Sequence, residues 1–318
     1  MKPVVVVGGG IVGACVAYQV ARAGVPLVVI FRDGGVTARS FGWIGGTGGE
    51  WPGGAGALRP FVLADWRDLS AAVPGVQVRW SGSVTWPGGG VSGRDIARLE
   101  PHLRTFPTSS CCIPDDGSVD PAEVTRALLL AARELGARLV SGATVTAVHD
   151  GEVVSSAGRH PASTVVIAAG TGTSLLCPPV AVPASPAFLM RVRAPAGLVR
   201  TIVGTPAYDV REAAGGMLLA TAPLGADRTW AGLRALAGRT VEELRAAFGP
   251  GLRLVDWTVG DRPMPPDGPV IGPVSPGVYV AVMHPGICLA PTAGRLVAQE
   301  ITGGGPAPEL VNCRPSRG

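Results

Sequence analysis

Three glycines near the start of the chain are spaced to hold a nucleotide cofactor. Gly8, Gly10 and Gly13 form a G-x-G-x-x-G pattern directly after an apolar run at 4–7. The first glycine of such a pattern allows a tight turn, and the second lets backbone N–H groups approach a pyrophosphate. The third lets a helix pack closely on a strand. Because the flanking segments read as a strand and a helix, the pattern indicates a dinucleotide-binding βαβ unit.

The acidic residue that usually completes such a site is absent. In dinucleotide-binding domains a carboxylate at the end of the second strand holds the adenosine ribose. Counting from Gly13, this position is Phe31, followed by Arg32 and Asp33. Three interpretations remain open. Asp33 reaches the ribose from further along, or the contact is lost and affinity is lower, or Arg32 accepts the 2′-phosphate of NADP.

Composition excludes several other kinds of chemistry. Lys2 is the only lysine, which excludes a Schiff-base lysine and a phosphate-binding P-loop. The six cysteines form no C-x-x-C pair and the four histidines have no ligand spacing, so we expect no metal site. The net charge of +4 comes from scattered arginines, which argues against nucleic acid as a partner. Reduced thiols fit a cytoplasmic location.

The elements that must position these groups alternate between strands and helices. Strands are predicted at 2–8, 26–30, 136–140, 144–148, 163–170 and 277–283. Helices are predicted at 14–23, 120–135, 240–248 and 291–301, the second of them with Asp120 as N-cap and Pro121 in its first turn. Glycines interrupt the apolar run at 4–17, so it reads as a buried strand and helix and no membrane association is expected.

The stretch 183–262 has a different pattern. Its alternating segments, such as 190–193 and 216–221, predict a smaller β-rich domain. We therefore expect a discontinuous cofactor domain at 1–60, 95–182 and 263–304, a substrate domain at 61–94 and 183–262, and a C-terminal tail at 305–318.

Four blocks of sequence resemble the superfamily of D-amino-acid oxidase, glycine oxidase and sarcosine oxidase. They are Val4–Gly13, Ser40–Ile44, Thr164–Gly170, and Arg262–Gly268 continuing through His284–Pro291. The resemblance implies an α/β fold in which a Rossmann-type FAD-binding domain carries a smaller β-rich substrate domain. It favours FAD over NADP, because NAD dehydrogenases have no counterpart to the last block. The FAD is expected to be non-covalent, since no cysteine lies near the position where sarcosine oxidases attach flavin.

The resemblance also assigns the cofactor contacts. Val145 and Thr146 match the strand that meets the adenine, and residues 286–289 match the segment beneath the flavin pyrimidine ring. The complete expected set is Gly8, Gly10, Ile11, Val12, Gly13, Phe31, Arg32, Arg39, Ser40, Gly42, Trp43, Val145, Thr146, Ala168, Ala169, Gly170, Gly286, Ile287, Cys288 and Leu289.

Four further residues are expected around the substrate. Arg262 matches the arginine that pairs with a substrate carboxylate, where a planar guanidinium makes a bidentate contact. Tyr208 and Arg211, on one strand of the second domain, are candidates for the opposite wall. His284 either faces the flavin or is a hydrogen-bonded core histidine.

The activity implied is oxidation of the C–N bond of a small amino acid or amine to an imine, by hydride transfer to flavin N5. The electrons then pass to O2 or another acceptor, and oxidase and dehydrogenase are not separated by the sequence. Two alternatives remain: a tailoring dehydrogenase for a bulky or carrier-bound amine, and a non-catalytic FAD-binding subunit. The oligomeric state is not predicted.

Overall fold

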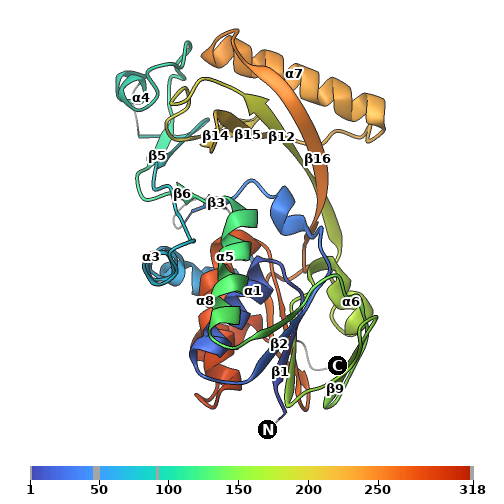
Figure 1. Ribbon diagram of the computed structural model, residues 1–318. Helices are drawn as coiled ribbons and strands as arrows, with labels where there is room; N and C mark the ends of the chain where they lie inside the picture. The colour runs from blue at the N-terminus through green and yellow to red at the C-terminus, as the bar shows by residue number, and fades with distance from the viewer. Residues whose placement is uncertain (1, 46–50, 91–92, 316–318) are drawn as a thin grey trace.

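The computed structural model describes residues 2–45, 51–90 and 93–315 and has two parts (Figure 1). The part that contains both termini is built on a parallel sheet flanked by helices. The other part is a mostly antiparallel sheet covered by the long helix α7 (Trp230–Phe248). Two long strands, β12 (Ala184–Arg193) and β16 (Arg253–Pro263), run from the second sheet toward the first part. An α/β fold with a Rossmann-type domain and a β-rich second domain is confirmed.

The sheet of the first part has six strands in the order β17-β18-β11-β1-β2-β7. Their bounds are Val270–Ser275, Val278–Val282, Thr164–Ile167, Val4–Val7, Leu27–Ile30 and Arg138–Val140. All neighbours are parallel except β17 and β18. Val7 lies level with Ile30 on one side and Ile167 on the other, so three strands end at one edge. Strands β2 and β11 lie on opposite sides of β1, and their connections diverge at this edge. In an open α/β sheet, such a point is where a ligand crevice forms.

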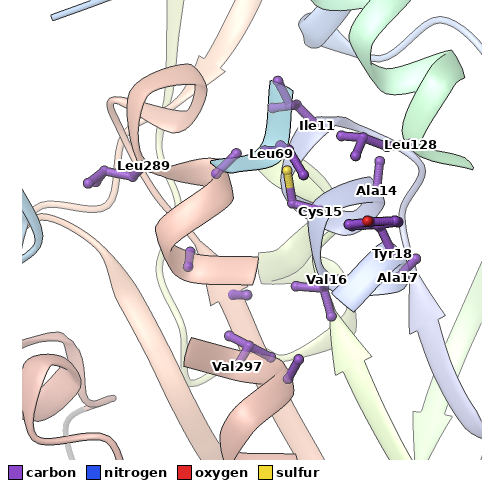
Figure 2. Close-up of a cluster of buried hydrophobic side chains, with 14 of the residues drawn as sticks. Ile11, Ala14, Cys15, Val16, Ala17, Tyr18, Leu69, Leu128, Leu289 and Val297 are labelled. Carbon is purple, nitrogen blue, oxygen red and sulfur yellow. The ribbon is translucent and has the colours of Figure 1, made fainter. Parts of the chain in front are cut away.

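Helices cover one face of this sheet and share its core. They are α1 (Ile11–Arg22), α3 (Val62–Ala72), α5 (Pro121–Glu134) and α8 (Gly286–Ile301). Figure 2 shows side chains of α1, α5 and α8 meeting in this core. A methyl group on Gly294 of α8 would lie 2.7 Å from the Cβ of Cys15 on α1, so the two helices touch through their backbones.

The other face carries a small antiparallel sheet. Its strands are β8 (Val145–His149), β9 (Glu152–Ser155) and β10 (Gly158–Pro161), and the short helix α6 (Thr173–Leu176) lies beside them. Buried residues of β1, β2, β11 and β18 pack there with Val153 and Ala162.

The second sheet has seven strands in the order β16-β12-β15-β14-β13-β4-β5. The strands not yet defined are β4 (Ser83–Thr85), β5 (Cys111–Ile113), β13 (Ile202–Gly204), β14 (Asp209–Ala213) and β15 (Met217–Thr221). Helices α7 and α4 (Gly93–Leu99) pack on its apolar face. A two-stranded ladder of β3 (Trp43–Ile44) and β6 (Gly117–Ser118) lies in the connections between the two parts. The short helix α2 (Ala55–Leu58) packs in the core of the first part.

Two predicted helix starts are wrong. Helix α7 begins at Trp230, ten residues before the predicted start, because Thr229 accepts a hydrogen bond from the N–H of Gly232 and caps it there. Helix α8 begins at Gly286, so Pro291 lies inside the helix and not at its first position. A proline in a second turn removes one internal hydrogen bond, which is why the sequence suggested a start at that residue.

The hydrophobic cores of the two parts divide some segments differently from the predicted domains. Trp66 and Leu69 of α3 and Leu310 of the C-terminal segment are buried in the core of the first part. Ile96 and Leu103 are buried in the core of the second sheet. We therefore propose boundaries that follow the cores, with α3 and the C-terminal segment in the first part and 83–113 in the second.

None of the described helices is long and apolar enough to cross a membrane. All six cysteines are free thiols.

Candidate active site

A cavity of about 930 Å³ opens at the carboxyl ends of β1, β2 and β11 and extends to the second sheet. One end is formed by the N-terminus of α1, the turn after β11 and Val145 of β8. The other end is formed by Trp43, the start of α8 and strands β12, β14, β15 and β16. We call these the cofactor end and the substrate end.

The three motif glycines serve two different purposes. Gly8 has φ +116°, and a methyl group there would lie 2.2 Å from the carbonyl oxygen of Ala168. A methyl group on Gly13 would lie 2.0 Å from the carbonyl oxygen of Gly8. A methyl group on Gly10 would meet only the hydroxyl of Thr37, at 3.0 Å. The fold therefore requires Gly8 and Gly13, whereas Gly10 keeps the cavity open for a close-lying ligand, as the motif predicts.

The N-terminus of α1 is suited to a diphosphate. It has no capping side chain and no acidic residue in its first turn. The Ile11 N–H donates to the Thr37 hydroxyl at 3.2 Å, and Gly10 and Val12 line the cavity beside it. The positive end of the helix dipole thus faces the cavity, and no acidic side chain of its first turn competes for it. A dinucleotide fits this cradle.

A second helix begins at the substrate end. Helix α8 also starts without a capping side chain or an acidic residue, and a methyl group on Gly286 would meet nothing within 4 Å. Trp66 donates its indole N–H to the Cys288 carbonyl at 3.1 Å, and the Cys288 thiol donates to the Trp43 carbonyl at 3.3 Å. These contacts fix the helix start, whose dipole would stabilise negative charge on a bound group.

The strand end that lacks an acidic residue is filled by an aromatic ring. Phe31 lines the cavity, and a methyl group on Gly9 would lie 2.5 Å from its Cγ, so the ring lies against the glycine turn. Arg32 also lines the cavity. Asp33 is exposed and is not among the described residues that line it, which gives no support to the interpretation that Asp33 reaches the ribose.

Arg262 and His284 meet at the substrate end. Arg262, near the end of β16, donates to the carbonyl of Ser185 at 3.4 Å and to its hydroxyl at 3.1 Å. Within the described part of the chain it forms no ion pair, and burial lowers its pKa. Burial, and secondarily the nearby guanidinium, lowers the pKa of His284 to about 4. At neutral pH this wall therefore presents an uncompensated positive charge beside a neutral imidazole.

Arg211 does not have the predicted role. The residue is 4% exposed, and its guanidinium donates to the carbonyl oxygens of Phe41, Val119 and Glu212 at 2.6, 2.7 and 3.1 Å. Burial lowers its pKa to about 10, ahead of a smaller opposite effect from Asp120. Arg211 therefore braces the segment before Trp43 and lies outside the cavity lining.

Tyr208 lines a pocket next to the main cavity and does not line the main cavity itself. It is 7% exposed and packs in the core of the second sheet, and burial raises its pKa to about 12. It lines a side pocket of about 200 Å³ that shares Arg262 with the main cavity.

Most of the expected cofactor residues lie on the cavity. Gly13, Thr146 and Leu289 do not line it: Gly13 packs on the Gly8 carbonyl, Thr146 is exposed, and Leu289 is buried in the core. The cavity brings together Gly8, Gly10, Ile11, Val12, Phe31, Arg32, Arg39, Ser40, Gly42, Trp43, Val145, Ala168, Ala169, Gly170, Gly286, Ile287 and Cys288.

Three carboxylates on the cavity were missed from the sequence: Asp116, Asp209 and the exposed Asp261 of β16. Asp116 is 1% exposed and accepts hydrogen bonds from Trp43 Nε1 at 2.9 Å and from the Ser83 hydroxyl at 2.7 Å. Asp209 is the first residue of β14. Strand alternation does not single out Asp209, because Arg211 has the same parity in β14 and lies outside the cavity lining.

Comparisons with known proteins agree with this geometry. The family described as FAD dependent oxidoreductase (DAO) matches residues 3–300. A glycine oxidase of Bacillus licheniformis is 26% identical over 354 residues, covering 94% of this chain and 92% of that protein. An L-proline dehydrogenase from P. horikoshii has a TM-score of 0.84 at 19% identity, covering 99% and 97% of the two chains. An L-amino acid deaminase from Proteus vulgaris has a TM-score of 0.85 at 22% identity, covering 100% and 94%.

Proposed function

The chain belongs to the DAO family of FAD-dependent oxidoreductases, and from that premise we propose that it oxidises the C–N bond of a small amino acid to an imine. FAD, and not NADP, is therefore its cofactor. The glycine oxidase of Bacillus licheniformis, which aligns with nearly the whole chain, supports an amino acid as the substrate class.

The observation that carries this proposal is the uncompensated Arg262 guanidinium on the cavity wall. A partly buried cation whose own hydrogen bonds go only to Ser185 gains most from an anionic ligand. A planar carboxylate matches the fork of a guanidinium, and charge-assisted pairs are the stronger hydrogen bonds. The neutral imidazole of His284 beside it does not compete for the carboxylate.

The remaining residues hold and shield the reactants. Gly10 and the start of α1 would hold the pyrophosphate, and the start of α8 would lie at the flavin. When bound, FAD supplies the acceptor for the hydride that leaves the carbon next to the amine. Arg262 fixes the substrate by its carboxylate and so orients that carbon. The walls formed by Trp43 and Phe188 exclude water from the reacting carbon. Hydrolysis of the imine then yields an oxo acid and ammonia.

The proposal is tested by replacing Arg262 in the FAD-loaded protein. Arg262→Ala should lower kcat/KM for an α-amino acid by about tenfold or more, because a hydrogen bond to a charged group contributes roughly 1.5–3 kcal/mol. Arg262→Lys should restore little, since an ammonium does not reproduce the fork. Arg253→Ala, an exposed arginine on the same strand and outside the cavity, is the matched control and should behave as wild type.

The measurement is the anaerobic rate of flavin reduction as a function of substrate concentration. The loss should be confined to substrates with a carboxylate, and the corresponding amines without one should react equally with wild type and Arg262→Ala. Equal kinetics of the two proteins on an α-amino acid would remove Arg262 from carboxylate binding.

A further inference from the structure

Asp209 lies where the main cavity and the side pocket meet. It pairs with Gly204 of β13 on one side and with Thr221 of β15 on the other, in the middle of the second sheet. Asp209 lines both spaces, together with Thr221 and Arg262. The side pocket is therefore an extension of the substrate end, and Asp209 stands at the junction.

The carboxylate of Asp209 has no charged partner. Among the residues that the structure describes, it makes no hydrogen bond or ion pair, and burial raises its pKa to about 6. Arg262, the cation on the same wall, is directed to Ser185. A partly buried charge without a partner is costly to the folded protein, and its cost is offset when a ligand supplies the opposite charge.

Aromatic rings lie next to this carboxylate. A methyl group on Gly204 would lie 3.1 Å from Asp209 Oδ1 and 3.5 Å from Cη2 of Trp43, so the two side chains are neighbours. Phe188 lines both the cavity and the side pocket. A carboxylate with aromatic side chains in the same pocket is an environment that favours a cationic nitrogen.

The nitrogen that is oxidised is a poor match for this position. It must be neutral when the hydride leaves, because its lone pair forms the new C=N bond. An ion pair with a carboxylate would hold it protonated and block this step. A second nitrogen, further along the substrate, has no such requirement.

We propose that Asp209 determines substrate specificity by binding a positively charged nitrogen on the substrate side chain, so that the substrate is a basic amino acid with its second nitrogen in the side pocket. The inference rests on the proposed function, because Arg262 binds the carboxylate at the other end of the same substrate. Arg262 of β16 would thus bind the negative charge of the ligand, and Asp209 of β14 would bind its positive charge.

The test separates binding from oxidation by using ligands without an α-amine. The FAD-loaded protein is titrated in a calorimeter with 6-aminohexanoate, which keeps the carboxylate and the distal ammonium of a lysine-like substrate, and with hexanoate, which lacks the ammonium. Wild type should bind 6-aminohexanoate about tenfold more tightly than hexanoate. Asp209→Asn should bind the two ligands equally, with its affinity for hexanoate unchanged.

The control is Asp68→Asn, which removes an exposed carboxylate of α3 outside the cavity and should retain the tenfold preference. Equal binding of both ligands by wild type, an equal loss for both ligands in Asp209→Asn, or binding of neither would overturn the inference.

Anaerobic reduction by lysine and norleucine distinguishes this inference from the proposed function. Reduction by both at equal efficiency in wild type would leave amino-acid oxidation standing and remove Asp209 as the specificity residue. Binding of 6-aminohexanoate with the predicted preference, but no reduction by any amino acid, would remove the proposed function and leave the cation site.

Discussion

The two ends of the cavity differ in whether backbone groups or side chains meet the ligand. At the cofactor end the groups that meet the ligand are backbone: the glycine turn, the uncapped start of α1 and the small turn at 168–170. At the substrate end they are mainly side chains: Arg262 and Asp209 come from the second sheet, and the neutral imidazole of His284 comes from the loop after β18. A backbone-built site depends on where glycines stand in the sequence. A side-chain site depends on which residues the packing of a second domain turns toward the cavity.

Replacing the motif glycines should produce the largest effects and should separate ligand binding from folding. Gly10→Val should fold and yield protein free of FAD, because its side chain meets only the movable Thr37 hydroxyl but blocks the pyrophosphate. Gly13→Ala should lose about 3 kcal/mol or more of stability, since its methyl group would overlap the Gly8 backbone.

The measurements are flavin absorbance per protein and thermal unfolding. Gly238→Ala is the control, because a methyl group there meets nothing within 4 Å and replaces a glycine inside α7. Full flavin occupancy in Gly10→Val would place the phosphates elsewhere, and a stable Gly13→Ala would show that the helix is not held by this contact.

This difference between backbone and side-chain sites explains which parts of the candidate site could be predicted from the sequence. Gly8, Gly10 and Gly13 sit in a local βαβ unit, so their spacing and the flanking elements predicted a dinucleotide-binding unit at the cofactor end. Arg262 came from the resemblance to a family and not from its own pattern. Arg211 was misassigned because the carbonyl oxygens that hold it come from segments distant in the sequence.

Asp209 was missed for the same reason. A single aspartate at the start of a strand carries no signal until the partner elements are known. Its position beside Trp43 results from packing between residues far apart in the chain.

At the cofactor end, Phe31→Glu should tighten FAD binding by about tenfold, because a carboxylate at the end of β2 could accept both ribose hydroxyls through charge-assisted bonds. Equilibrium dialysis of apo protein against FAD measures the change, with Phe31→Gln as the uncharged control. Unchanged or weaker binding of the Glu variant would show that the phenyl ring, packed on the glycine turn, already provides the better contact.

At the substrate end, Asp209→Asn should raise the free energy of unfolding of the protein without a bound substrate. The expected gain is about 1–2 kcal/mol at pH 8, after allowance for partial exposure of the carboxylate. The folded-state pKa of about 6 lies above the ordinary value of 3.8. The carboxylate therefore costs nothing below about pH 4, and its cost grows as pH rises to about 6 and stays constant above it.

The stability difference between Asp209→Asn and wild type should follow that curve in denaturant titrations from pH 4 to 8. A difference that is independent of pH would show that the Asp209 charge is already compensated in the folded protein.

Anaerobic titration of the purified yellow protein with single amino acids, followed at the flavin absorbance band, tests the central claim most directly. We expect one or more amino acids to bleach the flavin completely, with one ammonia released per FAD, and acid precipitation of the same protein to release the flavin into the supernatant. Flavin that dithionite bleaches, but that no amino acid or amine reduces, would contradict the claim and leave an FAD-binding protein without this activity.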